Sequence, residues 1–223
     1  ALEMSRVEGL DLDAVIFTNL TQDHLDFHKN MENYLSSKLK IFNLLKLSTK
    51  ERKMAFINAD LKETQVLKDS LAHLDLPYET FGFSNQSNWT AYSSSMTITH
   101  NVFTISYGSC DYEIDTPLLG EFNLYNALGS VATSVFLGAK KEGIETGLKN
   151  LVVPGRFEPV FNSLGFSVIV DYAHTPDALN NVLLTALSLY PKNLICVFGA
   201  GGDRDKTKRP LMGAISAQHS HYT

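Results

Sequence analysis

The sequence predicts an α/β protein made of two units, and three features of the chain support this fold class. Apolar runs of the length of buried parallel strands alternate with helical periodicity before residue 78. Residues 78–117 then hold β-prone runs separated by Gly, Ser and Asn turns, which predict a small antiparallel sheet. Beyond Pro154-Gly155 the strand–helix alternation starts again. We therefore expect a first unit at 1–153 and a second unit, cut short, at 154–223.

Strands and helices alternate in the first unit. The apolar run Ala14–Phe17 predicts a buried strand, and apolar residues at 3.6-residue spacing predict a helix at 30–46 with Asn30 as its cap. The further expected elements are a strand at 54–60, a helix at 63–73, the β-prone runs Thr80–Phe83, Trp89–Tyr92, Met96–Thr99, Val102–Tyr107 and Tyr112–Asp115, and helices at 123–137 and 142–151.

The second unit repeats this alternation. A strand is expected at Ser167–Val170, followed by a helix at 176–189 that Pro176 opens. A second strand is expected at Leu194–Phe198 and a last helix at 210–218. The sequence therefore predicts one strand–helix–strand segment and a further helix in this unit.

Composition narrows the class of protein. The chain has 223 residues and a net charge of −5, which argues against nucleic acid as its main partner. No apolar run approaches the ~20 residues of a membrane-spanning helix, and the charged residues in the first nine positions do not fit a signal peptide. Cys110 and Cys196 lie far apart, and Cys196 is expected to be a buried thiol. We therefore expect a cytoplasmic protein.

Polar and ionisable residues begin directly after the strand predicted at Ala14–Phe17. Ligands of open α/β sheets gather beyond the carboxyl ends of strands, so this stretch is a candidate metal or phosphate site. Carboxylate and imidazole groups together suit Mg²⁺ or Mn²⁺ with a phosphate, or Zn²⁺. The alternative is an N-capped turn with a hydrogen-bonded histidine. The residues concerned are Asp23, His24, Asp26 and His28.

Lys38 stands on the apolar face of the helix predicted at 30–46. It follows Tyr34 by four residues and precedes Ile41 by three, which puts all three on one face. Partial desolvation would lower the pKa of Lys38 and favour the neutral amine. The alternative is a lysine whose stem lies on the apolar face while its ammonium reaches water.

Two loops of the second unit follow expected strands. Residues 199–206 combine glycines with charged residues, but they lack the Gly-Lys-Thr/Ser of a Walker A loop and the spacing of a dinucleotide fingerprint. Residues 171–176 place a carboxylate, an aromatic ring and an imidazole in a row, which suits ribose, a base and a phosphate. A solvated charged loop and a capped loop are the respective alternatives. Because both loops end strands of one expected sheet, they can face one site.

Seven motifs follow one another along nearly the whole chain. They are Thr18-Asn19-Leu20-x-x-Asp23-His24-Leu25-Asp26-x-His28, Tyr34-x-x-x-Lys38, Asn58-Ala59-Asp60, Gly120-x-Phe122-Asn123-x-x-Asn126, Gly155-Arg156-Phe157-Glu158, Asp171-Tyr172-Ala173-His174-Thr175-Pro176-Asp177-Ala178-Leu179 and Gly201-Gly202-Asp203-Arg204-Asp205-x-x-Lys208-Arg209-Pro210. In this order they resemble the Mur ligase family, the ATP-dependent amide-bond ligases of peptidoglycan precursor synthesis, and most of all the ligases that add the third amino acid of the peptide. The resemblance implies a central domain with a mostly parallel sheet, helices and a small antiparallel sheet, then part of a Rossmann-like C-terminal domain.

Several parts of the family pattern are missing. The chain lacks the UDP-binding domain, the Gly-Lys-Thr phosphate loop, the Glu-Val-Ser-Ser strand with its magnesium-binding glutamate, and the Asp/Glu-Asn-Pro-Arg motif that selects the amino acid. Glu3 is not that glutamate, which by spacing would precede Ala1. The chain thus resembles a fragment of a longer ligase, and we expect the fragment alone to be inactive.

The resemblance implies a substrate set and residue roles. ATP and Mg²⁺ are the cofactors, the partners are the UDP-N-acetylmuramoyl dipeptide and diaminopimelate or lysine, and a monomer is expected. The catalytic residues implied are Lys38, carbamylated by CO₂, with His24 and His174; metal contacts are assigned to His24, Lys38 and Asp23. The nucleotide-binding residues implied are Asn126, Arg156, Asp171 and Asp203, and substrate contacts are assigned to Arg6, Thr18, Asn19 and Arg204.

Two other functions remain open at the level of sequence. Folylpolyglutamate synthetase shares the architecture and the acyl-phosphate route, and would act on a folate. A non-catalytic nucleotide-binding module would hold ATP without forming ADP.

Overall fold

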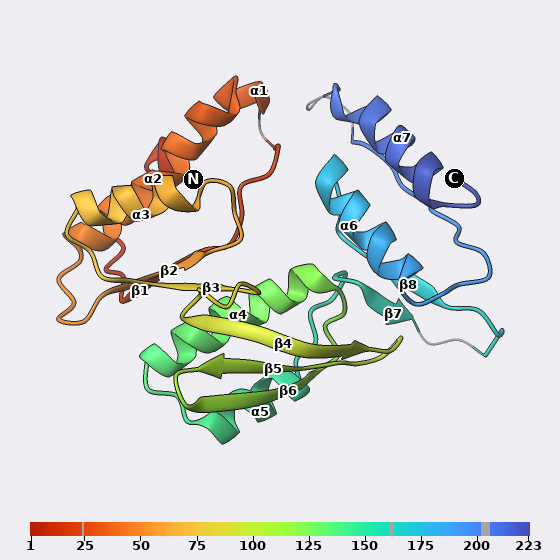
Figure 1. The fold of residues 1–223 in the computed structure, drawn as a ribbon. Coiled ribbons are helices and arrows are strands. Elements are labelled where there is room, and N and C mark those ends of the chain that lie inside the picture. Colours follow the sequence, from red (N-terminus) through yellow and green to blue (C-terminus); the bar gives the residue numbers. More distant parts are fainter. Residues whose placement is uncertain (24, 161–162, 202–205) are drawn as a thin grey trace.

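The computed structural model describes residues 1–23, 25–160, 163–201 and 206–223, and its ribbon is shown in Figure 1. Six strands of the first unit form one sheet with the order β1-β2-β3-β4-β5-β6. The first three pairings are parallel, and the last two are antiparallel. The strands are β1 (Ala14–Phe17), β2 (Met54–Asn58), β3 (Tyr78–Gly82), β4 (Trp89–Met96), β5 (Asn101–Tyr107) and β6 (Cys110–Thr116).

The α/β fold class is confirmed, and the antiparallel strands prove to be continuous with the parallel ones. The run expected at Thr80–Phe83 is β3, which pairs parallel with both β2 and β4. Thr80, Phe81 and Gly82 are all buried, as in a strand covered on both faces. The short β-prone segments after residue 78 therefore extend the first sheet instead of forming a separate one.

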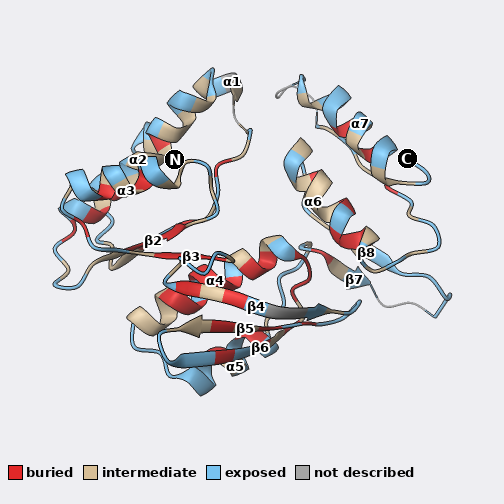
Figure 2. Ribbon diagram, viewed as in Figure 1, coloured by how far each residue is buried: buried red, intermediate tan, exposed pale blue. Residues whose placement is uncertain are grey.

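Helices cover both faces of this sheet (Figure 1). The place of β2 between two helix layers explains its apolar sequence. Ala55 and Ile57 belong to the core under α2 (Met31–Leu47) and α3 (Thr64–His73), whereas Phe56 belongs to the core under α4 (Glu121–Phe136) and α5 (Lys141–Lys149). Figure 2 shows the buried residues gathered along the strands and the inner helix faces. The helices are α1 (Leu25–His28), α2 (Met31–Leu47), α3 (Thr64–His73), α4 (Glu121–Phe136) and α5 (Lys141–Lys149), after a short 3₁₀ turn at Leu2–Met4.

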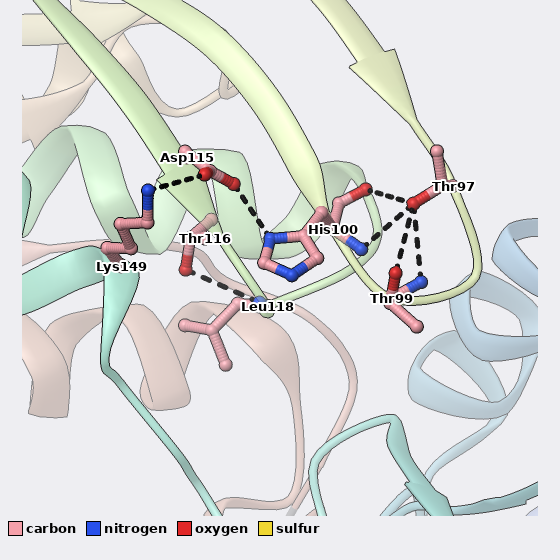
Figure 3. A network of polar contacts seen from close by, with 7 residues as sticks. All are labelled: Thr97, Thr99, His100, Asp115, Thr116, Leu118 and Lys149. Carbon is pink, nitrogen blue, oxygen red and sulfur yellow. Dashed lines mark hydrogen bonds and ion pairs between the residues drawn. The ribbon is translucent and has the colours of Figure 1, made fainter.

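The run Met96–Thr99 is not the strand that its β-prone residues predicted. β4 ends at Met96, and the hydroxyl of Thr97 accepts the backbone N–H groups of Thr99 (3.3 Å) and His100 (3.1 Å), as Figure 3 shows. A threonine that satisfies nearby backbone donors competes with a strand ladder and favours a turn. His100 also contacts Asp115 on β6 at 2.7 Å, which lowers the pKa of Asp115 and fixes the turn to the sheet.

The described residues of the second unit form a hairpin and two helices. β7 (Glu158–Val160) pairs antiparallel with β8 (Val168–Val170), and α6 (Pro176–Leu187) packs against α7 (Lys208–His219). The hydroxyl of Thr175 accepts the N–H of Ala178 at 3.2 Å and caps α6. Among the described residues no strand pairing crosses Pro154, and the domain boundary at 153/154 stays a prediction.

The strand expected at Leu194–Phe198 is absent. Its one strand-like pairing is an isolated bridge from Ile195 to Tyr222, with Cys196 N–H donating to the Tyr222 carbonyl at 2.9 Å. Cys196 is buried as expected, but Val197 is 94% exposed. A strand needs a neighbouring backbone along its length, and in the described part of the chain only the segment around Tyr222 supplies one.

The two units meet at the start of α4. Leu119, Phe157 and Ala186 form a small buried cluster that joins the first unit to the hairpin and α6. Gly120 lies against Thr185 of α6 so closely that a β-carbon there would be 2.7 Å from the Thr185 hydroxyl oxygen. No described helix has the length and apolarity needed to cross a bilayer.

Candidate active site

A cleft of about 970 Å³ lies where the carboxyl ends of β1 and β2 face the second unit. Both units supply its walls. Of the two loops of the second unit that were expected to share one site, 171–176 lines the cleft with Asp171 and Thr175, whereas no described residue of 199–206 is among the lining residues. The polar residues of the first unit that line it are Thr18, Asn19, Thr21, Asn58, Asp60, Asn101, Glu121, Tyr125 and Asn126, and those of the second unit are Arg156, Asp171, Thr175, Asp177, Asn181, Thr185 and Ser188.

Asn58 joins the loops that follow β1 and β2. Its side-chain amide donates to the Thr18 carbonyl at 2.9 Å, and its side-chain oxygen accepts the backbone N–H of Asp60 at 2.9 Å. Asn58 itself is buried. A buried amide with both ends hydrogen-bonded fixes its neighbours, so Thr18 and Asp60 hold defined places in the cleft wall.

Lys38 extends from α2 towards the loop after β1. Its Nζ donates to the Asn19 carbonyl at 2.8 Å and lies 5.0 Å from the ring centre of Tyr34 and 5.5 Å from that of Phe17. Burial among these groups lowers the pKa of Lys38, and the nearby Asp23 acts in the opposite direction. The amine is therefore held beside the cleft with a lowered pKa, the direction that its place on the apolar helix face predicted.

Asp23 of the first unit and His174 of the second come close to each other, although neither is a lining residue of the cleft. Their side chains approach to 3.8 Å, Oδ2 to Nε2, and Nδ1 of His174 lies 2.9 Å from the Tyr172 carbonyl. Because a carbonyl only accepts hydrogen bonds, Nδ1 carries a proton and Nε2 faces Asp23. His24, expected beside Asp23, lies outside the described residues.

Asp171 holds the segment that carries Arg156. Its Oδ2 accepts the N–H of Phe157 and its Oδ1 accepts the N–H of Ala173, both at 2.7 Å. Phe157 has a φ of 48°, a left-handed conformation that this hydrogen bond stabilises. The Arg156 guanidinium lies 4.8 Å from the ring centre of Tyr172. Asp171 thus fixes the backbone around Arg156 at the cleft.

Asn126 lies on the first turns of α4 at the opposite wall. Its side-chain amide donates to Asn123 Oδ1 at 3.2 Å, and Asn123 in turn donates to the Leu119 carbonyl at 2.8 Å. Asn123 is buried and Asn126 is exposed to the cleft. The two asparagines of the Asn-x-x-Asn motif therefore have different roles: Asn123 anchors the start of the helix, and Asn126 faces the cleft.

The remaining expected residues are placed as follows. Thr18 and Asn19 line the cleft, whereas Arg6 is exposed after the first 3₁₀ turn and is not a lining residue. Asp203 and Arg204 lie outside the described residues. The roles that the resemblance implies for all of these residues remain predictions.

Sequence reasoning did not assign roles to Asp60, Phe83 and Tyr125, which also line the cleft. Asp60 directly follows β2, just as Thr18 and Asn19 directly follow β1. Its position beyond the carboxyl end of a parallel strand, where ligands gather, was the signal that could have identified it. Phe83 and Tyr125 come together only through the fold: their ring centres are 4.8 Å apart at 75°.

Comparison with known proteins identifies the family. The Mur ligase middle domain matches residues 1–134, which is more than half of the chain, and the Mur ligase glutamate ligase domain matches residues 155–222. This chain belongs to the Mur ligase family. It is 41% identical to the UDP-N-acetylmuramoyl-L-alanyl-D-glutamate–2,6-diaminopimelate ligase of Syntrophomonas wolfei over 228 residues, covering all of this chain and 45% of that protein. The chain thus spans about half the length of the curated Mur ligases it matches.

Solved structures share the fold of this Mur ligase chain. The structure of a UDP-N-acetylmuramoyl-L-alanyl-D-glutamate–2,6-diaminopimelate ligase aligns with a TM-score of 0.73 and 28% identity, covering 99% of this chain and 45% of that one. Mycobacterium tuberculosis folylpolyglutamate synthase, complexed with ADP and AMPPCP, aligns with a TM-score of 0.70 and 17% identity, covering 84% and 42%. The second likeness concerns the fold alone.

Proposed function

We propose that the full-length protein containing this chain is an ATP-dependent ligase that adds diaminopimelate to UDP-N-acetylmuramoyl-L-alanyl-D-glutamate. The observation that carries the proposal is the 41% identity, over the whole chain, to a ligase with this name. The cleft between the two units supports it, because residues of five of the seven family motifs line its walls. The proposal further assigns ATP as the phosphate donor and a monomer that acts in the cytoplasm.

The proposed reaction has two steps. A carboxylate oxygen of the D-glutamate attacks the γ-phosphorus of ATP, which releases ADP and forms an acyl phosphate. The amine of diaminopimelate then attacks the acyl carbon, loses a proton and expels phosphate, leaving an amide. Positioning and charge stabilisation supply most of the catalysis of such transfers.

In the proposal, residues of this chain bind the nucleotide and the other substrates. Asn126 contacts the adenine, Arg156 and Asp171 serve the ribose region, and His174 and Asp203 lie on loops that face the nucleotide. On the substrate side, Thr18, Asn19 and Arg6 contact the muramoyl dipeptide. Arg204 holds a carboxylate of the incoming amino acid, because a guanidinium binds a carboxylate through two parallel hydrogen bonds.

Mg²⁺ is the metal that the family resemblance implies, and the groups beside the cleft suit it. Among the described residues no three His, Cys, Asp or Glu side chains come together as a metal site. Attack of the neutral Lys38 amine on CO₂, with loss of a proton, would add an anionic carbamate near Asp23, and Mg²⁺ prefers oxygen ligands. His24 would complete the set. Bound there, the ion would neutralise charge on the transferring phosphoryl group.

The experiment that tests this function is a ligation assay with the full-length protein. ADP is expected to form only when ATP, Mg²⁺, the UDP-muramoyl dipeptide and diaminopimelate are all present, with one amide product per ADP. Faster turnover with lysine would change the amino acid assigned. Turnover with a folate and glutamate instead would favour a folylpolyglutamate synthetase, and ATP binding without ADP release would favour a non-catalytic module.

Replacing Arg156 by alanine should raise the KM for ATP by about tenfold, while kcat changes less. The guanidinium lies against Tyr172 in the cleft wall, where it can hold the second unit over the nucleotide. Arg52 offers a matched control, since its guanidinium also lies 4.8 Å from an aromatic ring centre, that of Phe136, but outside this cleft. Equal KM values for ATP in the Arg156→Ala and Arg52→Ala proteins would refute the role of Arg156.

A further inference from the structure

Asp60 brings together three separate elements at the cleft. Its Oδ2 accepts the backbone N–H of Phe83, just after β3, at 2.7 Å and the hydroxyl of Tyr125, on α4, at 3.0 Å. Asp60 itself follows β2. Within the described part of the chain no hydrogen bond reaches its other oxygen, Oδ1. The carboxylate is thus fixed through one oxygen, and Asp60 is a lining residue of the cleft whose second oxygen has no hydrogen bond among the described residues.

The surroundings of Asp60 are shaped to keep the carboxylate in this place. A β-carbon on Gly82 would lie 2.5 Å from Asp60 Oδ2, so glycine leaves the space that the carboxylate fills. The rings of Phe83 and Tyr125 stand edge to face beside it. Burial and the nearby Asp60 charge raise the pKa of Tyr125, so its hydroxyl stays protonated and donates.

Charge indicates which part of a nucleotide this wall can bind. Among the described residues that line the cleft, Arg156 is the one Lys or Arg side chain. The acidic lining residues are Asp60, Glu121, Asp171 and Asp177. Carboxylates repel a polyphosphate but accept hydrogen bonds from amino and hydroxyl groups, so these walls suit the nucleoside part of the ligand.

Within that nucleoside part, Asp60 lies on the base side. Tyr125, which donates to Asp60, directly precedes Asn126 on α4, and both face the cleft. Asp171, by contrast, is engaged through both oxygens by backbone N–H groups on the far wall. The aromatic pair beside Asp60 offers a surface for a planar base, and Oδ1 is a free acceptor next to it.

We propose that Asp60 is a specificity-determining residue that accepts a hydrogen bond from the exocyclic amino group of the purine base, with Tyr125 and Phe83 holding the carboxylate in position. The inference rests on the proposed function, in which the cleft binds ATP. A carboxylate aimed at this position rejects a base that carries a carbonyl there, because two acceptors would face each other. The cleft should therefore bind adenine nucleotides and exclude inosine and guanine nucleotides.

The test compares ATP with inosine triphosphate, whose base has a carbonyl in place of the amino group. Dissociation constants of both are measured by calorimetry with full-length wild-type protein and the Asp60→Asn variant, with Mg²⁺ and without the other substrates. Asparagine keeps an oxygen for the Phe83 N–H and can donate to a carbonyl. The dissociation constant of inosine triphosphate divided by that of ATP is expected to be lower in Asp60→Asn than in the wild type by about tenfold or more. Asp69→Asn is the matched control: Asp69 is exposed on α3, accepts from Gln65 at 2.8 Å and should leave the ratio unchanged.

The possible outcomes separate this inference from the proposed function. Equal weakening of ATP and inosine triphosphate in Asp60→Asn would mean a purely structural role and would overturn the assignment, while the ligase function stands. If Asp60→Asn weakens the binding of ATP but not that of 2′-deoxy-ATP, the carboxylate contacts the ribose, and its assignment to the base is overturned. A wild-type protein that binds neither nucleotide would contradict the proposed function, and the inference would fall with it.

Discussion

Replacing Lys38 by alanine is expected to lower kcat of the full-length ligase by at least about 100-fold. The Nζ of Lys38 is held beside two aromatic rings and the Asn19 carbonyl, and burial lowers its pKa, which makes the neutral amine easier to reach. A neutral amine can take up CO₂ and become an anionic oxygen ligand, which an ammonium cannot be. Loss of that ligand would leave the magnesium beside the γ-phosphate with too few oxygens.

Chemical rescue distinguishes this role from a structural one. Formate or acetate can occupy the volume that Lys38→Ala leaves, so activity should recover in proportion to the carboxylate concentration. Labelled CO₂ should give a carbamate signal by ¹³C NMR in the wild-type protein and none in the variant. Lys40→Ala is the control on the same helix, because its exposed contact with Glu3 lies outside the cleft. Near-normal turnover of Lys38→Ala without additives would contradict the metal assignment.

Replacing Gly120 by alanine is expected to lower the free energy of unfolding by about 3 kcal/mol or more. Gly120 has φ 92° and ψ 151°, a region that is essentially restricted to glycine. A β-carbon there would also lie 2.7 Å from both the Thr185 hydroxyl oxygen and the Phe122 ring. The substitution therefore strains the start of α4 and pushes α6 away from it.

Urea unfolding of the full-length protein measures this effect. Gly143→Ala is the matched control, because Gly143 lies within α5 with open space around its α-carbon. Alanine favours a helix interior over glycine by about 1 kcal/mol, so this control should be neutral or stabilising. Because Gly120 joins the two units, its alanine variant should also bind ATP more weakly. An unfolding midpoint equal to the wild type would show that the contact with Thr185 relaxes freely.

The parts of the fold that follow from local sequence were predictable. β2 is a continuous apolar run that ends in polar residues, and α2 has apolar residues at helical spacing. Asn30 caps α2 as expected, with its side chain accepting the N–H of Asn33 at 2.8 Å. The segment at Leu194–Phe198 has equally strong β propensity but lacks neighbouring strands among the described residues. Strand pairing depends on distant chain, so propensity alone could not decide it.

The candidate site was predictable where it follows strand ends and hidden where it depends on packing. The loops after β1 and before α6 were found because polar residues follow apolar runs. The hydrogen bond from Tyr125 to Asp60 joins residues that are 65 positions apart, and no local pattern indicates it. The approach of Asp23 to His174 likewise arises only when the second unit lies over the first.

Oxygen transfer tests the central claim, an acyl-phosphate ligation at this cleft, most directly. The UDP-muramoyl dipeptide is labelled with ¹⁸O in the D-glutamate carboxylate that forms the amide, and the inorganic phosphate released by the full-length protein is analysed by mass spectrometry. That carboxylate oxygen attacks the γ-phosphorus and stays bound to it when the amine displaces phosphate from the acyl phosphate. One labelled oxygen is therefore expected in each inorganic phosphate that is released as an amide forms. Amide formation with unlabelled phosphate, or with the label in AMP, would contradict the account.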